Sequence, residues 1–319
     1  MIDYSIIIPA LIAFAVSVIL GPFVIPMLRN LKMSNTERKE GMETHLKKAG
    51  TPTMGGIMIL AGFTVACIFF IPRFPKLGPV LFLTLAFGLI GFIDDYLKVV
   101  KHNSDGLIAW QKLILEFGVT LVFCLYMRFG TGIPMTIRIP FAGGRMADIG
   151  FLAVPLLFFA VLGTVNAVNF TDGIDGLSSS VTIVVSLFFV VVSQTLESGT
   201  GPAAGALIGA LMGFLVYNAY PAKVFMGDMG SLALGGFVAG MAYMLQMPLF
   251  ILLFGIVYLC EILSVMIQVT YFKATHGKRV FKMTPIHHHF EKCGWSETRI
   301  VAVFSVVAAI GSLIALLAV

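Results

Sequence analysis

The sequence predicts an all-α polytopic membrane protein with about ten transmembrane helices. Of its 319 residues, 58% are hydrophobic and only 12% are charged, whereas soluble domains average roughly 45–50% apolar and about 25% charged residues. Apolar runs approaching the roughly 20 residues that a membrane helix needs recur along the whole chain. The basic residues gather in alternate loops. Little length is left for a separate soluble domain, so we expect one integral membrane domain over residues 1–319.

The apolar segments, taken in chain order, define the expected spans. They cover approximately residues 5–28, 53–71, 77–93, 110–128, 151–168, 178–195, 202–220, 231–246, 249–271 and 299–318. Glycine and proline recur within them, which membrane helices tolerate. Between the fourth and fifth segments, the alternation in MTIRIPF predicts a short hairpin within residues 130–150.

The distribution of lysine and arginine predicts the orientation. Sixteen of the 21 basic residues lie in or beside the loops that follow the odd-numbered segments, and positively charged loops stay cytoplasmic. Both termini are therefore expected outside. The net charge of +5 then belongs to one face, where it suits anionic lipid headgroups or phosphorylated substrates. We expect a membrane-lipid partner and no nucleic acid.

The unusual polar motifs fall on this same cytoplasmic side. Because the loops share one face of one bundle, we expect a single active site at the inner membrane surface. The motifs are KKAGTPTMGG (47–56), the pair at 94–95, NAVNFTDGIDGL (166–177), NAYPAKVFMGDMGS (218–231) and HGKRVFKMTPIHHHFEKCGW (276–295).

Asp94 and Asp95 stand where the third apolar segment stops. A charged side chain costs about 2.5–3.5 kcal/mol at the bilayer centre and less at its edge. One interpretation is a simple helix end, with Lys98 as an ion-pair partner. The other is a cation site, because two adjacent carboxylates repel each other and hard oxygen ligands suit Mg²⁺.

The glycine-rich acidic motifs favour a ligand site. Asp172 and Asp175 each precede a glycine, which allows close approach of the backbone to a ligand; the alternative is an Asx/Gly turn. Asp228 lies between two glycines before the eighth segment, where capping or helix-dipole compensation is the alternative. The Phe225 ring could stack on a flat base, although membrane anchoring is the commoner aromatic role.

The basic motifs favour phosphate recognition. Lys48 precedes small residues at a helix start, which is a plausible phosphate cradle, with lipid binding as the alternative. Neighbours in the run His287–His289 would point about 100° apart on a helix, so they are better donors to phosphate or sugar oxygens than ligands of one metal. A surface tract is the alternative. For Gln268 and Glu261, the residues alone favour hydrogen bonding between helices.

Together these features predict chemistry between a nucleotide and a lipid. The cations imply phosphate, and the acids imply a divalent metal that bridges phosphate oxygens. The membrane edge implies that one substrate is a lipid. We therefore expect transfer of a phosphate-linked group from a soluble nucleotide donor to a lipid phosphate. An ion-coupled transporter is an alternative from another class, but transporter sites usually lie near the midplane between internal repeats. A scaffold that binds ligands without turnover is a third.

Five blocks resemble a known enzyme family. GTPTMGG, DDYLK, NAVNFTDGIDGL, FMGDMGSLALGG and PIHHHFEKCGW are similar, in the same order, to the signature blocks of the phospho-N-acetylmuramoyl-pentapeptide transferases, within the polyprenyl-phosphate N-acetylhexosamine-1-phosphate transferase superfamily. The PIHHHFE block favours this family over the relatives that transfer N-acetylglucosamine-1-phosphate, which are the alternative.

The resemblance implies an activity and its setting. The donor would be UDP-N-acetylmuramoyl-pentapeptide, the acceptor undecaprenyl phosphate, and the products lipid I of peptidoglycan synthesis and UMP. The enzyme would be a Mg²⁺-dependent homodimer in the bacterial plasma membrane, with its active site on the cytoplasmic side.

The resemblance also implies roles for individual residues. Asp228 would bind Mg²⁺, Asp94 and Asp95 would serve the lipid phosphate, and His287 would join these aspartates as a catalytic residue. The substrate-binding residues would be Lys48, Thr53, Asp175, Asn218 and Phe225, mostly toward the uridine, and Asn169, Asp172, Gln268, His288 and His289 toward the sugar and phosphates.

The lipid phosphate hardly needs a base to become a nucleophile. The second pKa of a phosphate monoester is near 6, so at pH 7 it is mostly dianionic. We therefore expect direct in-line displacement on the donor's β-phosphate, with a covalent aspartyl-phosphate intermediate as the alternative.

Overall fold

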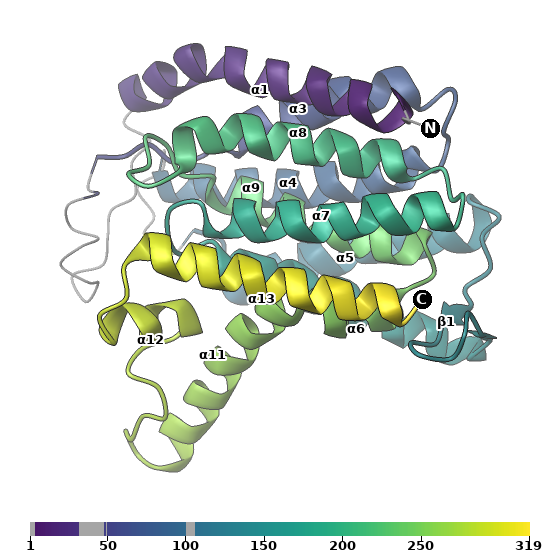
Figure 1. The fold of residues 1–319 in the computed structure, drawn as a ribbon. Helices are drawn as coiled ribbons and strands as arrows, with labels where there is room; N and C mark the ends of the chain where they lie inside the picture. Colours follow the sequence, from purple (N-terminus) through teal and green to yellow (C-terminus); the bar gives the residue numbers. More distant parts are fainter. Residues whose placement is uncertain (1–3, 32–47, 49, 100–105) are drawn as a thin grey trace.

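Long apolar helices run side by side through the computed structural model, which describes residues 4–31, 48, 50–99 and 106–319 (Figure 1). The long helices are α1 (Tyr4–Asn30), α3 (Gly56–Phe70), α4 (Leu77–Val99), α5 (Ala109–Phe129), α6 (Ala153–Thr171), α7 (Leu177–Thr195), α8 (Gly201–Asn218), α9 (Gly227–Met244), α11 (Ile256–Ala274) and α13 (Glu297–Leu317). The short elements are β1 (Ile137–Arg138), β2 (Met146–Ala147), η1 (Gly150–Leu152), η2 (Pro248–Phe250), α10 (Ile251–Phe254) and α12 (Ile286–Lys292).

The expected apolar segments all coincide with helices. Within the described ranges, seven helices are long and apolar enough to cross a membrane. An all-α polytopic membrane protein is thereby confirmed, whereas the number of ten crossings stays a prediction. The helix α3, for example, has only 15 residues.

The helix α9 forms the centre of the bundle. Its residues from Gly230 to Met244 are all buried, and it packs most extensively on α4 and also along α6 and α3. Small residues permit this close approach: a Cβ at Gly235 would collide with Val165 of α6, and one at Gly91 would collide with the carbonyl group of Asp228. The ends of α4 and α6 are therefore fixed beside the start of α9.

Two elements differ from the expected boundaries. The helix α4 does not stop at Ile93 but continues to Val99, so Asp94 and Asp95 lie within its last turns. The expected ninth span is broken at Gly255, after which α11 begins. Glycine is a poor helix former, which accounts for the position of the break.

The two ends of the bundle differ in character. The predicted hairpin is confirmed as the antiparallel pair β1–β2, in which Ile137 is opposite Ala147. Figure 1 shows β1 at the same end of the bundle as both termini, with α12 at the opposite end. The helix α11 leaves the bundle at an angle, and its far end stands clear of the other helices (Figure 1).

Candidate active site

The acidic pair of α4 is held by backbone amides. Asp94 and Asp95 are only 2% and 5% exposed. Asp95 Oδ2 accepts a hydrogen bond from the amide of Met229 in the first turn of α9 (3.0 Å), and Asp94 Oδ1 accepts one from the amide of Leu107 (2.6 Å). These bonds fix Asp95 against the start of α9 and Asp94 against the segment that precedes α5.

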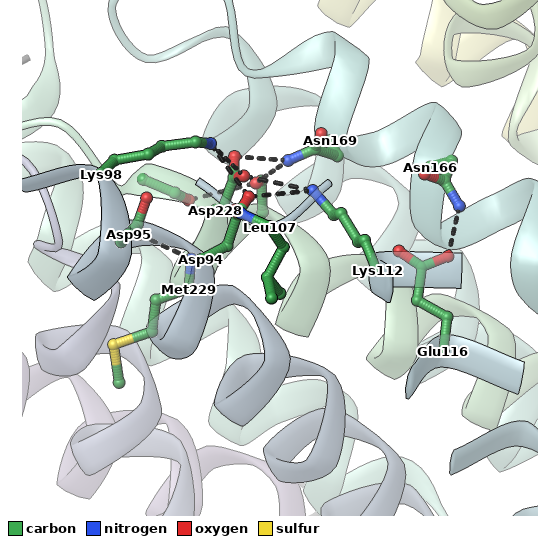
Figure 2. A network of polar contacts seen from close by, with 12 residues as sticks. Asp94, Asp95, Lys98, Leu107, Lys112, Glu116, Asn166, Asn169, Asp228 and Met229 are labelled. Carbon is green, nitrogen blue, oxygen red and sulfur yellow. Dashed lines mark hydrogen bonds and ion pairs between the residues drawn. The ribbon is translucent and has the colours of Figure 1, made fainter. Parts of the chain in front are cut away.

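Asp228 and Asp94 share two lysines. Lys98 Nζ lies 2.9 Å from Oδ2 of each aspartate, and Lys112 Nζ lies 3.2 Å from Asp228 Oδ2 and 3.5 Å from Asp94 Oδ2. Asn169 Nδ2 donates to the other carboxylate oxygen of Asp228 at 2.9 Å. Figure 2 shows these side chains, which come from α4, α5, α6 and α9, converging on one point. Two carboxylates and two ammonium groups therefore balance their charges at the end of the bundle.

A cavity of about 190 Å³ opens beside this cluster. It collects residues from four of the five motifs that the sequence singled out at this face. Its lining residues are Lys48, Thr53, Asp95, Lys98, Asn169, Asp172, Gly173, Ile174, Asp175, Asn218, Phe225, Gly227 and Asp228. The expected convergence of distant loops on one pocket is thus present in the structure, and the individual roles given to these residues stay predictions.

A second charged cluster contributes Lys48 and Asp175 to the lining of the cavity. Lys48 Nζ lies 2.7 Å from both Asp175 Oδ1 and Glu297 Oε2. Asp175 is held further by the amide of Ala222, which donates to its Oδ2 at 2.8 Å. Burial disfavours the charged form of Lys48, but the hydrogen bonds and negative charges of Asp175 and Glu297 outweigh burial and raise its pKa. Lys48 is therefore a fixed cation facing the cavity.

Asp172 stands among negative charges without a close cation partner in the described residues. Burial, followed by the charges of Asp228, Asp95 and Asp175, raises the pKa of Asp172 to about 8. Because of this raised pKa, the carboxyl group is mostly protonated at pH 7 and can donate a hydrogen bond. Asp172 follows the last residue of α6.

The histidine segment lies behind the cavity rather than in its lining. His287 is completely buried, and its Nδ1 lies 3.0 Å from Glu261 Oε2 of α11. His288 Nδ1 lies 2.6 Å from Glu291 Oε2. His289 Nδ1 accepts a hydrogen bond from the amide of Lys282 at 3.1 Å.

Gln268 also binds backbone rather than the cavity. Its Oε1 accepts hydrogen bonds from the amides of Val280 and Phe281, each at 3.0 Å. Gln268 and His289 thus fix the connection between α11 and α12, and their expected contacts with substrate stay predictions. Glu261 confirms the expected hydrogen bond between helices, since it reaches His287 on α12.

The donor set fits a magnesium ion that is shared with a substrate. In the part of the chain that the structure describes, no three His, Cys, Asp or Glu side chains are grouped to hold a metal by themselves. Mg²⁺, however, is usually bound by one or two carboxylates together with water and substrate phosphates. Asp228 and Asp94, whose Oδ2 atoms already share the same cations, provide such a pair.

Several site residues have only a weak sequence signal. Lys98 follows Asp94 by four residues, a helical ion-pair spacing that also fits a plain helix end. Lys112 and Glu297 come from α5 and α13, and nothing in their local sequence indicates their partners. Glu116, on α5, accepts a hydrogen bond from Asn166 at 2.8 Å and extends the network into the bundle (Figure 2).

Comparison with known proteins agrees with this arrangement. The model of the family described as glycosyl transferase family 4 matches residues 77–246, and a model described as phospho-N-acetylmuramoyl-pentapeptide-transferase signature 1 matches residues 48–60. The first range contains Asp94, Asp95, Asp172, Asp175 and Asp228, and the second contains Lys48 and Thr53.

Curated relatives match nearly the whole chain, and those that follow carry the name phospho-N-acetylmuramoyl-pentapeptide-transferase. The protein of Clostridium botulinum (strain Alaska E43 / Type E3) is 50% identical over 312 residues, which are 97% of this chain and 94% of the relative. The one of Acetivibrio thermocellus is 48% identical, over 92% of this chain and 89% of the relative. The one of Clostridium perfringens (strain 13 / Type A) is 46% identical, over 99% of each chain.

Proposed function

Because the chain belongs to the phospho-N-acetylmuramoyl-pentapeptide-transferase family, we propose that it transfers phospho-N-acetylmuramoyl-pentapeptide from UDP-N-acetylmuramoyl-pentapeptide to undecaprenyl phosphate. The products are lipid I, a precursor of peptidoglycan, and UMP. The observation that carries the proposal is the cavity in which Asp228, Asp95 and Lys48 from three distant motifs face one another. The proposed enzyme class is a Mg²⁺-dependent phosphoglycosyl transferase, in which carboxylates and a lysine of this kind serve the metal ion and the phosphates.

The donor occupies the cavity with its uridine toward Phe225 and the Lys48 cluster. Phe225 lines the cavity, and an aromatic ring there can stack on uracil. Asn218 and Asp175 lie on the same wall and offer polar groups to the base and ribose. Thr53, Lys48 and Asn169 then face the phosphates and the sugar.

Asp228 and Asp94 would hold Mg²⁺ together with the donor's phosphates. When bound, the ion neutralises phosphate charge and so helps to stabilise the transition state. The protein's own cations support the same task, because Lys98 and Lys112 lie within 3.5 Å of these carboxylates. Electrostatic stabilisation and positioning supply most of the catalysis in phosphoryl transfer.

The reaction proceeds by one direct displacement. A phosphate oxygen of the dianionic lipid phosphate forms a bond to the β-phosphorus of the donor, and the bond between that phosphorus and the oxygen bridging to UMP breaks. The electron pair leaves with UMP, so no proton transfer is required. Asp94 and Asp95 position the acceptor indirectly at the end of α4, where the bundle meets the headgroup region, because Lys98 and Lys112 beside them attract its phosphate.

The setting of the enzyme is part of the proposal. Ten helices cross the bacterial plasma membrane, both termini lie outside, and the active site faces the cytoplasm, where the nucleotide donor is found. The basic loops at the site end support this orientation. The whole chain acts as one integral membrane transferase domain and forms a homodimer.

Product analysis with two donors tests the proposal. Purified protein in nanodiscs, given UDP-N-acetylmuramoyl-pentapeptide, undecaprenyl phosphate and MgCl₂, is expected to release UMP and form the lipid-linked product, and EDTA is expected to stop both. Preference for UDP-N-acetylglucosamine would instead indicate the related N-acetylglucosamine-1-phosphate transfer. Solute movement across vesicles without any lipid-linked product would indicate a transporter.

A further inference from the structure

A carboxylate with no described lysine or arginine partner lies inside the helix that leaves the bundle. Glu261 of α11 is completely buried, and its ion-pair partner among the described residues is His287. Its other oxygen, Oε1, has no hydrogen-bond partner in the structure. Burying a carboxylate is costly unless it is paired, and ionisable residues inside membrane helices commonly have a function. The buried pair of Glu261 and His287 therefore points to a function.

The His287 ring is oriented by this contact. Nδ1 lies 3.0 Å from Glu261 Oε2, and the backbone amide of His287 lies 3.5 Å from the same oxygen. Oε2 is thus placed to accept hydrogen bonds from both the amide and Nδ1. The ring's second nitrogen, Nε2, must then point away from Glu261, whichever protonation state it has.

Nε2 is directed at the wall of the cavity. It is buried and has no hydrogen-bond partner among the described residues, and a Cβ at Gly173 would collide with it. Gly173 itself lines the cavity, between Asp172 and Ile174. Gly173 therefore adjoins the imidazole and also lines the space proposed for the donor's sugar and phosphates.

We propose that Glu261 is a positioning residue for His287: it holds the proton on Nδ1 and thereby keeps Nε2, as a hydrogen-bond acceptor, on the Gly173 side of the ring, toward the hydroxyl and amide donors of the sugar part of the nucleotide donor. This inference rests on the proposed function for the identity of the ligand. Glu261 lies on α11, and among the described residues its side-chain hydrogen bonds and ion pair go to His287, so it acts through the imidazole. The arrangement parallels metal-free and metal-bound sites in which a carboxylate fixes the tautomer of a functional histidine.

A competing explanation is that Glu261 only docks α12. The contact joins α11 to the first turn of α12, so its loss could displace the whole segment. Exchange of Glu261 for glutamine separates the two explanations, because glutamine keeps the size of the side chain. Its amide can also donate to Nδ1, which allows the opposite tautomer. Docking is then largely preserved while the control of the tautomer is lost.

The experiment compares Glu261→Gln, His287→Ala and the double variant in a coupled assay of UMP release with undecaprenyl phosphate and Mg²⁺. Glu261→Gln is expected to lower kcat by roughly tenfold or more, with a smaller change in KM for the donor, as carboxylate-to-amide exchange behind a functional histidine does elsewhere. The double variant should be no slower than His287→Ala, because a residue that acts only through the imidazole adds nothing once the imidazole is gone. Ser264→Ala, one turn further along α11, is the matched control and should keep wild-type kinetics.

A spectroscopic readout makes the inference independent of activity. ¹⁵N-histidine spectra of the full-length protein in nanodiscs, with His287→Ala for assignment, should place the proton on Nδ1 in the wild type and show a changed tautomer in Glu261→Gln. Unchanged kcat and an unchanged tautomer in Glu261→Gln would overturn the inference. A double variant that is much slower than His287→Ala would mean that Glu261 docks α12. A wild type without transferase activity would defeat the proposed function, and the tautomer measurement would still test the pair.

Discussion

At the scale of single residues, the site is a balance of buried charges. Asp94 and Asp228 would be costly to bury alone, and each is compensated by Lys98 and Lys112. Asp175 is compensated by Lys48 in the same way. Asp172 lacks such a partner in the described residues, and its carboxyl group avoids the cost by keeping its proton.

The stability of the ligand-free protein should therefore depend on pH through Asp172. The pKa of its carboxyl group is about 8 in the folded protein and near 3.9 when unfolded. Between these values the unfolded chain releases the proton and the folded protein retains it, so Asp172 lowers stability as pH rises from about 4 to about 8. Above pH 8 the effect is constant.

Asp172→Asn removes this dependence. Its melting temperature should exceed that of the wild type at pH 8.5, by an amount corresponding to about 1 kcal/mol or more, and the difference should shrink as pH falls to 5. Thermal unfolding in detergent with EDTA measures it. If Asp172→Asn raised the melting temperature by the same amount at pH 8.5 and at pH 5, the raised pKa of Asp172 would be contradicted.

The sequence predicted site residues correctly where neighbouring residues form a recognisable motif. Asp172 and Asp175 were singled out because each precedes a glycine in a dense polar turn, and both line the cavity. Glu297 and Lys112 were not, because each is a single charge near the end of an apolar helix and its partner is far along the chain. The substrate contacts of Gln268 and His289 stay predictions, and a sequence cannot show that each side chain also accepts a hydrogen bond from a backbone amide.

At the scale of elements, the contact between α4 and α9 sets the geometry of the site. Gly91 lies one turn before the acidic pair, and its Cα faces the carbonyl group of Asp228. The backbone cannot rotate aside as a side chain can. Any side chain at this position must push the two helices apart, together with the carboxylates they carry.

Gly91→Ala should consequently lower both stability and transferase activity. Overpacking of this kind typically costs about 1–3 kcal/mol, and the spacing of Asp94 from Asp228 would change with it. Gly118→Ala in α5 is the matched control, because a Cβ at Gly118 meets nothing within 4 Å and alanine favours the helix. Thermal unfolding and UMP release for the two variants make the comparison, and equal behaviour of both would refute this account of the helix contact.

The elements themselves were largely predictable, but their ends were not. Apolar runs and hydropathy located the helices because lipid requires long apolar segments whose backbone groups bond internally. The extension of α4 past Ile93 was missed, since it depends on lysines that arrive from α5 and from the helix's own next turn. The break at Gly255 was missed as well, because glycine occurs in unbroken membrane helices too.

At the scale of the whole molecule, the two ends of the bundle carry different chemistry. The hairpin and both termini lie at one end, and α12 lies at the other (Figure 1). A backbone hydrogen bond joins the C-terminal end of the chain to the hairpin: the amide of Phe141, beyond β1, donates to the carbonyl of Ala318 at 3.0 Å. Which end faces the cytoplasm follows from the charge distribution and stays a prediction.

Labelling of one native cysteine tests the orientation. Cys293 is exposed beside α12, so in a Cys260→Ser background a membrane-impermeant maleimide should react with it in inverted vesicles and not in intact spheroplasts. Arg145→Cys, in the loop of the hairpin and with Cys293→Ser added, should show the opposite pattern and serves as the control. Labelling of Cys293 from outside intact cells would reverse the proposed topology.

The most direct test of the whole account is the rate of UMP release by Asp228→Asn, with Asp148→Asn at the hairpin end as the matched exchange of charge. Both are measured in nanodiscs with UDP-N-acetylmuramoyl-pentapeptide, undecaprenyl phosphate and Mg²⁺. If the convergent carboxylates are the catalytic centre, Asp228→Asn loses activity by roughly 10²-fold or more and Asp148→Asn retains it. Wild-type turnover by Asp228→Asn would mean that the chemistry takes place somewhere else.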